Sequence, residues 1–139
     1  MIEKIIYKTK VYAIILRANF YKKGINFFTK DKDSFQLGYI NYKKNHEIKA
    51  HYHPRHKKVI NRTSEVLVVK KGKIRVDFFS NDKKQKYIES KILKERDTIL
   101  ILNGCHGFKV LKEVEMIEIK QGPYELKKDK IHIKSNIKK

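Results

Sequence analysis

The sequence predicts an all-β protein that folds as one domain. Many short segments alternate apolar and polar residues, and turn residues separate these segments. Segments with a helical period over ten or more residues are missing, and the chain contains no internal repeat. Its 139 residues, of which 40% are hydrophobic, suit one core and are few for two. These observations favour a sandwich or barrel of about ten short antiparallel strands.

Each expected strand is a run of alternating or apolar residues that ends at a turn. The strands are expected at residues 2–9, 11–16, 35–42, 47–53, 65–69, 73–79, 87–93, 98–102, 108–111 and 113–120, with a short edge strand at 131–133. Within a single domain 1–139, residues 1–34 form N-terminal strands and a connection that folds onto the barrel. Residues 35–124 form the barrel core, and residues 125–139 form a charged tail.

The formal net charge of +19 raises the question of nucleic-acid binding. Only five of the 34 basic residues are arginine, isoleucine is frequent, and the lysines are scattered in runs of at most two. This pattern is typical of an A/T-rich coding bias, whereas a nucleic-acid surface should be clustered. We therefore expect no nucleic-acid partner, and a nucleic-acid-binding β-barrel remains the weakest of three hypotheses.

Cysteine use and hydropathy indicate the compartment. A single cysteine, Cys105, excludes an intramolecular disulfide. The longest N-terminal apolar run, residues 11–16, is too short for a signal-peptide core or a membrane span. We expect a cytoplasmic protein with no membrane partner.

Four residues predict a metal site. His51 and His53 lie on one face of the strand expected at 47–53, Glu65 begins a later strand, and His106 lies in a turn that follows another. Three imidazoles and one carboxylate from different strands can meet inside a barrel and hold one divalent ion: Fe, Mn, Ni, Co or Zn. The alternative is exposed histidines with Glu65 paired to a lysine.

Two further residues leave the ligand set open. His56 can replace one of the expected ligands, because it lies three residues after His53. Cys105, next to His106, is either a soft ligand or a small buried residue.

The motifs resemble those of the cupin superfamily. His51-Tyr52-His53 supplies the His-x-His of the first cupin motif, and Glu65 with Gly72 supplies its Glu-x6-Gly. Gly104 and His106 stand near the glycine and histidine of the second motif. The resemblance implies a jelly-roll barrel, a metal with open coordination positions, and isomerase- or dioxygenase-type chemistry. It extends to small bacterial cupins that often accompany genes of carbohydrate biosynthesis.

The segment between the ligand strands predicts the substrate class. Eleven residues separate His53 from Glu65, where the cupin motif has three or four, and they include Arg55 and Arg62 but no acidic residue. Arginine binds carboxylates and phosphates through two parallel hydrogen bonds. We expect a small polar or anionic substrate, such as a sugar or sugar nucleotide. The alternative for this segment is a solvated basic turn.

Two residues after the last barrel strand, Lys120 and Tyr124, are candidate rim contacts, although Gly122-Pro123 also fits a plain turn. The apolar N-terminal strands, together with the habits of cupin relatives, predict a homodimer. Whether the protein is an enzyme or a non-catalytic metabolite-binding barrel stays open.

Overall fold

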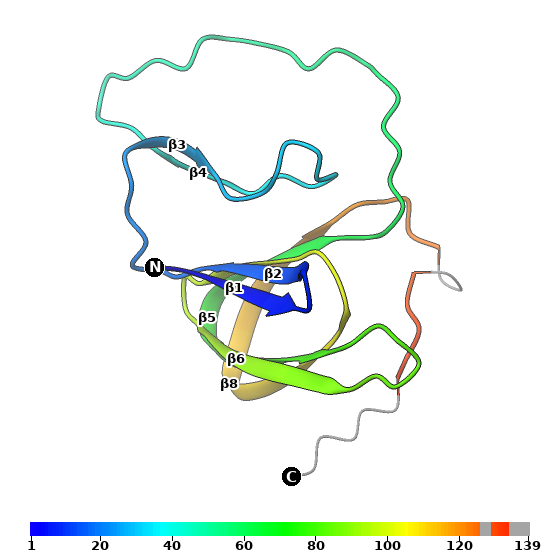
Figure 1. The fold of residues 1–139 in the computed structure, drawn as a ribbon. Helices are drawn as coiled ribbons and strands as arrows, with labels where there is room; N and C mark the ends of the chain where they lie inside the picture. The colour runs from blue at the N-terminus through cyan, green and yellow to red at the C-terminus, as the bar shows by residue number, and fades with distance from the viewer. Residues whose placement is uncertain (126–128, 134–139) are drawn as a thin grey trace. The chain divides into compact units, whose positions relative to one another are not determined.

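The structure, a computed structural model, describes residues 1–125 and 129–133. Within these residues it contains eight strands and no helix, which confirms the all-β prediction (Figure 1). The strands are β1 (Ile2–Tyr7), β2 (Lys10–Leu16), β3 (Gly24–Phe27), β4 (Gly38–Asn41), β5 (Glu65–Phe79), β6 (Tyr87–Lys94), β7 (Thr98–Ile101) and β8 (Cys105–Lys120). Among the described residues, no helix is present that is long and apolar enough to cross a membrane.

The chain divides into two compact units. Unit 1 comprises Met1–Phe20 and Thr63–Lys139, and unit 2 comprises Tyr21–Arg62. Six strands form one curled sheet in unit 1, and β3 and β4 form a separate antiparallel pair in unit 2.

The sheet of unit 1 is organised around β5. Along one edge, its first half pairs with β7 and its second half pairs with β6. Along the other edge, β8 follows β5 over almost its whole length. On the far side of β7, β2 and then β1 continue the sheet. Two strands sharing one edge of β5 require that strand to bend, and the sheet curls into half a barrel (Figure 1).

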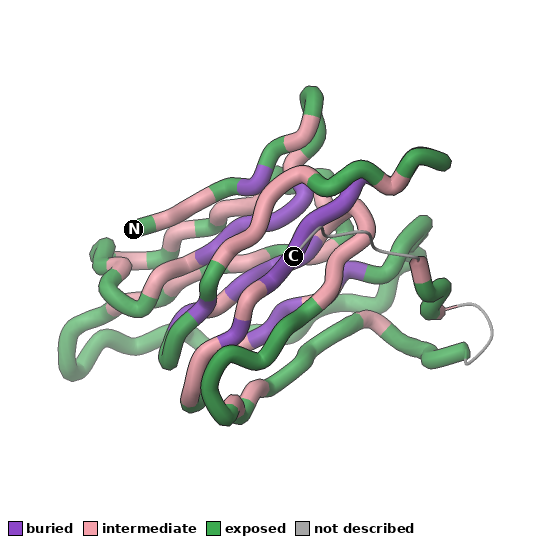
Figure 2. Tube along the Cα trace, turned by 90° about the horizontal axis from the view of Figure 1, so that it is seen from below, coloured by how far each residue is buried: buried purple, intermediate pink, exposed green. Residues whose placement is uncertain are grey.

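The core lies on the inner face of this curl. Buried residues, purple in Figure 2, lie along the strands of the sheet and are interspersed with partly buried ones. Those of β5 change phase: Leu67 and Val69 face the core before Gly72, whereas Ile74, Val76 and Phe78 face it afterwards. The core also takes Ile5, Tyr12, Ala13, Ile15, Leu93, Ile99 and Ile101 from the other strands.

Gly72 allows the change of phase. The β5–β8 register shifts on both sides of Lys71, which marks an irregularity of the β-bulge kind. Gly72 has φ +90°, and a Cβ there would lie 1.8 Å from the carbonyl oxygen of Glu113. Only glycine fits this position without strain. Two predicted strands, 65–69 and 73–79, are therefore one bent strand with apolar residues on the same face throughout.

An ion network fixes the corner between β2 and β7. The guanidinium of Arg17 lies between two carboxylates, with Nε 2.6 Å from Glu3 Oε1 and Nη1 2.7 Å from Asp97 Oδ2. The side chain of Arg17 is 18% exposed and that of Asp97 is 6% exposed, so this network is mostly shielded from water.

The predicted strand at 47–53 is wrong. Residues 46–61 form no strand or helix, and all of residues 42–63 are exposed. Ile48, Ala50 and Tyr52 alternate with polar residues as they would in a strand. All residues of the segment are exposed, however, and it pairs with no other strand in the described part of the chain, so its apolar face packs against nothing. The edge strand predicted at 131–133 is also absent. The connection expected at 17–34 contains β3, and the segments 108–111 and 113–120 belong to one strand, β8.

Candidate functional site

Glu65 and His106 come together in unit 1. His106 pairs with Phe78, which lies thirteen positions after Glu65 in β5. A straight strand of that length spans about 43 Å, yet Glu65 Oε1 lies 2.5 Å from His106 Nε2. The curl of β5 accounts for this closeness. Glu65 is opposite Ile101, the last residue of β7, and the short connection after Ile101 leads directly to β8.

The turn that places His106 is held against β2. The backbone N–H groups of Leu102 and Asn103 donate to the carbonyl of Tyr12, at 2.8 and 3.1 Å, and Asn103 Nδ2 donates to the Val11 carbonyl at 2.7 Å. Gly104 has φ +80°, and a Cβ there would lie 2.0 Å from the Tyr12 ring. Glycine at position 104 therefore lets the turn pack against the Tyr12 ring more closely than a residue with a Cβ would.

The electrostatics of Glu65 favour its charged form. Burial by itself raises the pKa of this carboxyl, but contact with His106 and the charges of His106, Lys120 and Lys130 outweigh burial, so the pKa is lowered. Glu65 is thus an ionised, partly buried acceptor at neutral pH. His106 Nδ1 is buried and has no hydrogen-bond partner within residues 1–125 and 129–133.

Polar residues at the end of β8 surround Glu65. Lys120 is opposite Glu65 in the β5–β8 register. Its ammonium lies 3.1 Å from a Glu118 oxygen and 5.2 Å from the centre of the Tyr124 ring. Gln121 Oε1 accepts a hydrogen bond of 2.8 Å from the Ser64 N–H, directly before Glu65. Lys120 thus lies near Glu65, and Tyr124 lies beside Lys120. The sequence pattern does not point to Gln121, a polar residue that directly follows β8.

The two remaining metal candidates belong to unit 2. His51 and His53 are exposed, and their ring centres lie 5.3 Å apart. The carbonyl of Lys49 lies 2.9 Å from His51 Nδ1. Because no strand forms there, the prediction that strand alternation places both rings on one face is wrong. Their closeness arises within an irregular segment instead.

Other sequence candidates lie along the same irregular segment. Arg55, His56 and Arg62 are all exposed, and His56 Nδ1 lies 3.1 Å from the Pro54 carbonyl. His46 stacks on Tyr42, with ring centres 3.6 Å apart.

The donor types suit a divalent metal, and they occur as two pairs. Glu65 and His106 supply one oxygen and one nitrogen donor in unit 1, and His51 and His53 supply two nitrogen donors in unit 2. Within the described part of the chain, no group of three or more His, Cys, Asp or Glu is arranged to hold a metal ion. Cys105 is a poor candidate ligand, because burial and then the charge of Asp82 raise the pKa of its thiol.

Comparisons with protein-family models, with curated proteins and with solved structures gave no match. The fold and the site thus define an all-β protein with a shielded Glu–His pair at the end of a curled sheet. Membership of the cupin superfamily remains a prediction from the sequence motifs.

Proposed function

We propose that the protein is a metal-binding cupin that acts on a small polar or anionic metabolite. The observation that carries this proposal is the meeting of Glu65 and His106. These residues are 41 positions apart in the sequence, yet their side chains touch at 2.5 Å, partly shielded from water. Both residues occupy positions that the sequence motifs assign to metal ligands. In this proposal the curled sheet of unit 1 is part of a complete cupin barrel.

The full ligand set of the proposal is His51, His53, Glu65 and His106. His51 and His53 are supported by their order in the cupin motif. Glu65 and His106 are supported by motif order and also by their contact. The charged Glu65 would supply an oxygen donor to such an ion, and His106 would supply a nitrogen donor. The divalent ion, Fe, Mn, Ni, Co or Zn, would supply Lewis-acid or dioxygen chemistry at the substrate oxygens.

Substrate binding is assigned to cationic and aromatic groups. Lys120 and Tyr124, beside Glu65, offer an ammonium and a phenol to a polar ligand, and Arg55 and Arg62 offer guanidinium groups to an anionic one. A sugar or sugar nucleotide has both kinds of group. The rival proposal is a non-catalytic metabolite-binding barrel with the same residues. Turnover of a bound ligand separates an enzyme from a binder.

Metal analysis tests the ligand set. Protein purified without chelators should carry about one divalent ion per chain, measured by elemental mass spectrometry. The double variant His51→Ala/His53→Ala and the single variant His106→Ala should each lose this ion. Matched controls are His46→Ala in unit 2 and His132→Ala in unit 1, two exposed histidines outside the set. Stoichiometric metal in either ligand variant would remove those residues from the site, and wild-type protein that binds no divalent metal would end the proposal.

The expected homodimer also remains a proposal, but fewer exposed apolar residues support it than the sequence suggests. Half of the ten apolar N-terminal residues that suggested it, namely Ile5 and the run from Tyr12 to Ile15, are buried inside unit 1. Ile6, 54% exposed, is the most exposed of these ten residues. Sedimentation at physiological salt checks the assembly.

A further inference from the structure

A second concave feature lies in unit 1, between two turns. It is a pocket of about 490 Å³, lined by Tyr7, Lys8, Asp82, Lys83, Lys84 and Lys86. Tyr7 and Lys8 come from the turn between β1 and β2, and the other four come from the connection between β5 and β6. Pockets of this size hold small metabolites. None of its residues belongs to the proposed metal site.

The charge of the pocket is strongly positive. Four lysines and one aspartate give its lining a formal charge of +3. Among the described residues, none of these four ammonium groups has a carboxylate within ion-pair distance. Most lysines elsewhere in this protein are scattered, so four around one concavity form a local field that attracts anions.

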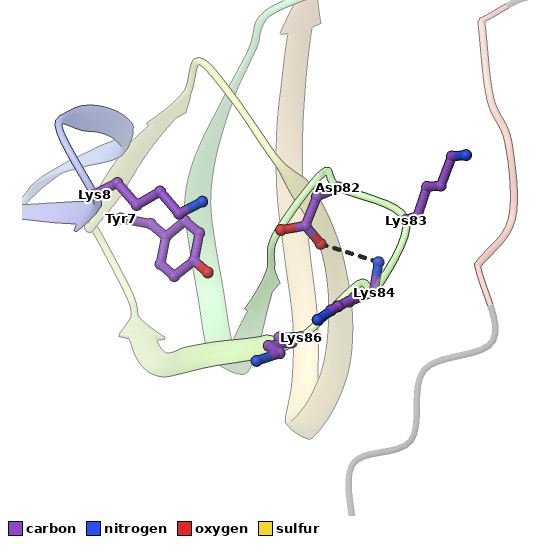
Figure 3. Close-up of a pocket in the computed structure, with 6 residues that line it drawn as sticks. All are labelled: Tyr7, Lys8, Asp82, Lys83, Lys84 and Lys86. Atoms are coloured by element: carbon purple, nitrogen blue, oxygen red, sulfur yellow. Dashed lines mark hydrogen bonds between the residues drawn. The ribbon is translucent and has the colours of Figure 1, made fainter.

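The one carboxylate of the pocket is committed to its own turn. Asp82 Oδ1 accepts hydrogen bonds from Ser80 Oγ at 2.8 Å and from the Lys84 N–H at 3.0 Å, the second of which Figure 3 shows. The hydrogen bond from Ser80 is the main reason why the pKa of Asp82 is lowered, and the charge of Lys8 across the pocket contributes. Asp82 therefore shapes the turn, and it forms no ion pair with any of the four ammonium groups.

The connection that carries the lysines is held in place from both ends. Ser80, 1% exposed, accepts from the Lys86 N–H through its hydroxyl at 2.9 Å and donates its own N–H to the Lys86 carbonyl at 2.8 Å. Gln85 N–H donates to the Asp82 carbonyl at 3.0 Å. Lys8 itself has φ 55°, a conformation that costs a residue other than glycine energy. Both turns thus present their lysines from defined backbone positions.

We propose that this pocket is a binding site for a small phosphorylated metabolite, with a diphosphate-type group held by Lys8, Lys84 and Lys86. Lysine binds phosphate as a compact point charge with three donors. The Tyr7 hydroxyl lies among these ammonium groups in Figure 3 and is a further donor, whereas the Lys83 side chain is directed away. A compact ligand with two or more negative charges can neutralise the lining from inside the concavity.

Calorimetric titration with inorganic pyrophosphate tests this site. The protein is first freed of metal with a chelator, which is then removed, and the titration is done at physiological salt, where unspecific charge effects are screened. We expect saturable binding of one pyrophosphate per chain. The double variant Lys84→Gln/Lys86→Gln should weaken the affinity at least tenfold, and Lys8→Gln alone should weaken it severalfold, because each removes a charge-assisted contact.

Two controls separate this site from general charge and from the metal site. Lys4→Gln/Lys109→Gln removes the same charge from exposed strand positions and should change the affinity less than twofold. His106→Ala should bind pyrophosphate like the wild type. Equal weakening in the lysine control, or no saturable binding, would overturn the proposal. Displacement of pyrophosphate by a short DNA duplex would overturn it in favour of an extended polyanion. The metal proposal survives each of these outcomes.

Discussion

Asp97 is expected to be the most sensitive charged residue of unit 1. It is 4% exposed, and its carboxylate accepts three hydrogen bonds and forms an ion pair with the Arg17 guanidinium. Arg17 Nη1 donates to Oδ2 at 2.7 Å, the Lys94 N–H donates to Oδ2 at 3.0 Å, and the Ala18 N–H donates to Oδ1 at 2.9 Å. Asp97→Ala removes all of these acceptors at once.

The magnitude follows from what remains after the substitution. Removing one partner of a buried ion pair costs about 3–5 kcal/mol. Arg17 keeps Glu3 and the Ile92 carbonyl, which places the loss near the lower end of that range. The N–H groups of Ala18 and Lys94 lose their acceptor, which adds to the cost unless water reaches them. We expect a loss of about 3–4 kcal/mol and a Tm lower by roughly 10–20 °C.

Urea unfolding followed by circular dichroism measures this loss as a free energy of unfolding. Asp31→Ala is the matched control, because Asp31 is exposed, and it should stay within about 0.5 kcal/mol of the wild type. Asp97→Asn keeps one acceptor and the side-chain shape, so it should lose less than Asp97→Ala. A loss below about 1 kcal/mol for Asp97→Ala would refute the reasoning, since it would mean that the network leaves stability unaffected.

Two further perturbations test the same sheet. The pKa of Glu3 is lowered, first because Arg17 donates a hydrogen bond to its carboxylate. Glu3 therefore contributes to the free energy of unfolding above its unfolded-state pKa, and this contribution is lost as pH falls through its folded-state pKa. Between pH 6 and pH 3, Glu3→Gln should therefore lose less stability than the wild type in urea titrations, and an equal loss would contradict this. Gly72→Ala should cost more than about 2 kcal/mol through its positive φ and the contact with Glu113, whereas Gly107→Ala, with open space at Cβ, should cost less than about 1 kcal/mol. Equal melting temperatures for the two glycine variants would contradict the role of Gly72.

The sequence predicts the strands well where apolar alternation is long. The all-β class, the turn at Lys94–Asp97 and most strands of unit 1 follow from period-two patterns, because burial against one core imposes that period. The prediction fails at 47–53, where Ile48, Ala50 and Tyr52 alternate with polar residues but stay exposed, because the segment pairs with no other strand among the described residues. It also divides β5 and β8 at points where the register shifts, because a bulge looks like a strand end in a linear pattern.

The candidate site is predictable only in part, for a related reason. Motif order selects Glu65 and His106 as partners, and their contact agrees with that choice. Motif order does not reveal the pocket around Lys8 and Lys86. The two turns that form this pocket are about 75 residues apart, and lysine is frequent throughout the chain. The β1–β2 and β5–β6 pairs form these turns, and the curled sheet that joins the two pairs through β7 brings the turns together.

The curl of β5 and the Glu65–His106 contact have one physical cause. If alternation ran unbroken through Gly72, Leu67 and Phe78 would lie on opposite faces of the sheet, and one half of the strand would expose its apolar residues. The phase change puts both halves on the inner face. Glu65 shares the face of Leu67 by alternation, and His106 shares the face of Phe78 as its cross-strand partner. The irregularity that completes the core therefore also directs the carboxylate and the imidazole into the same concave space.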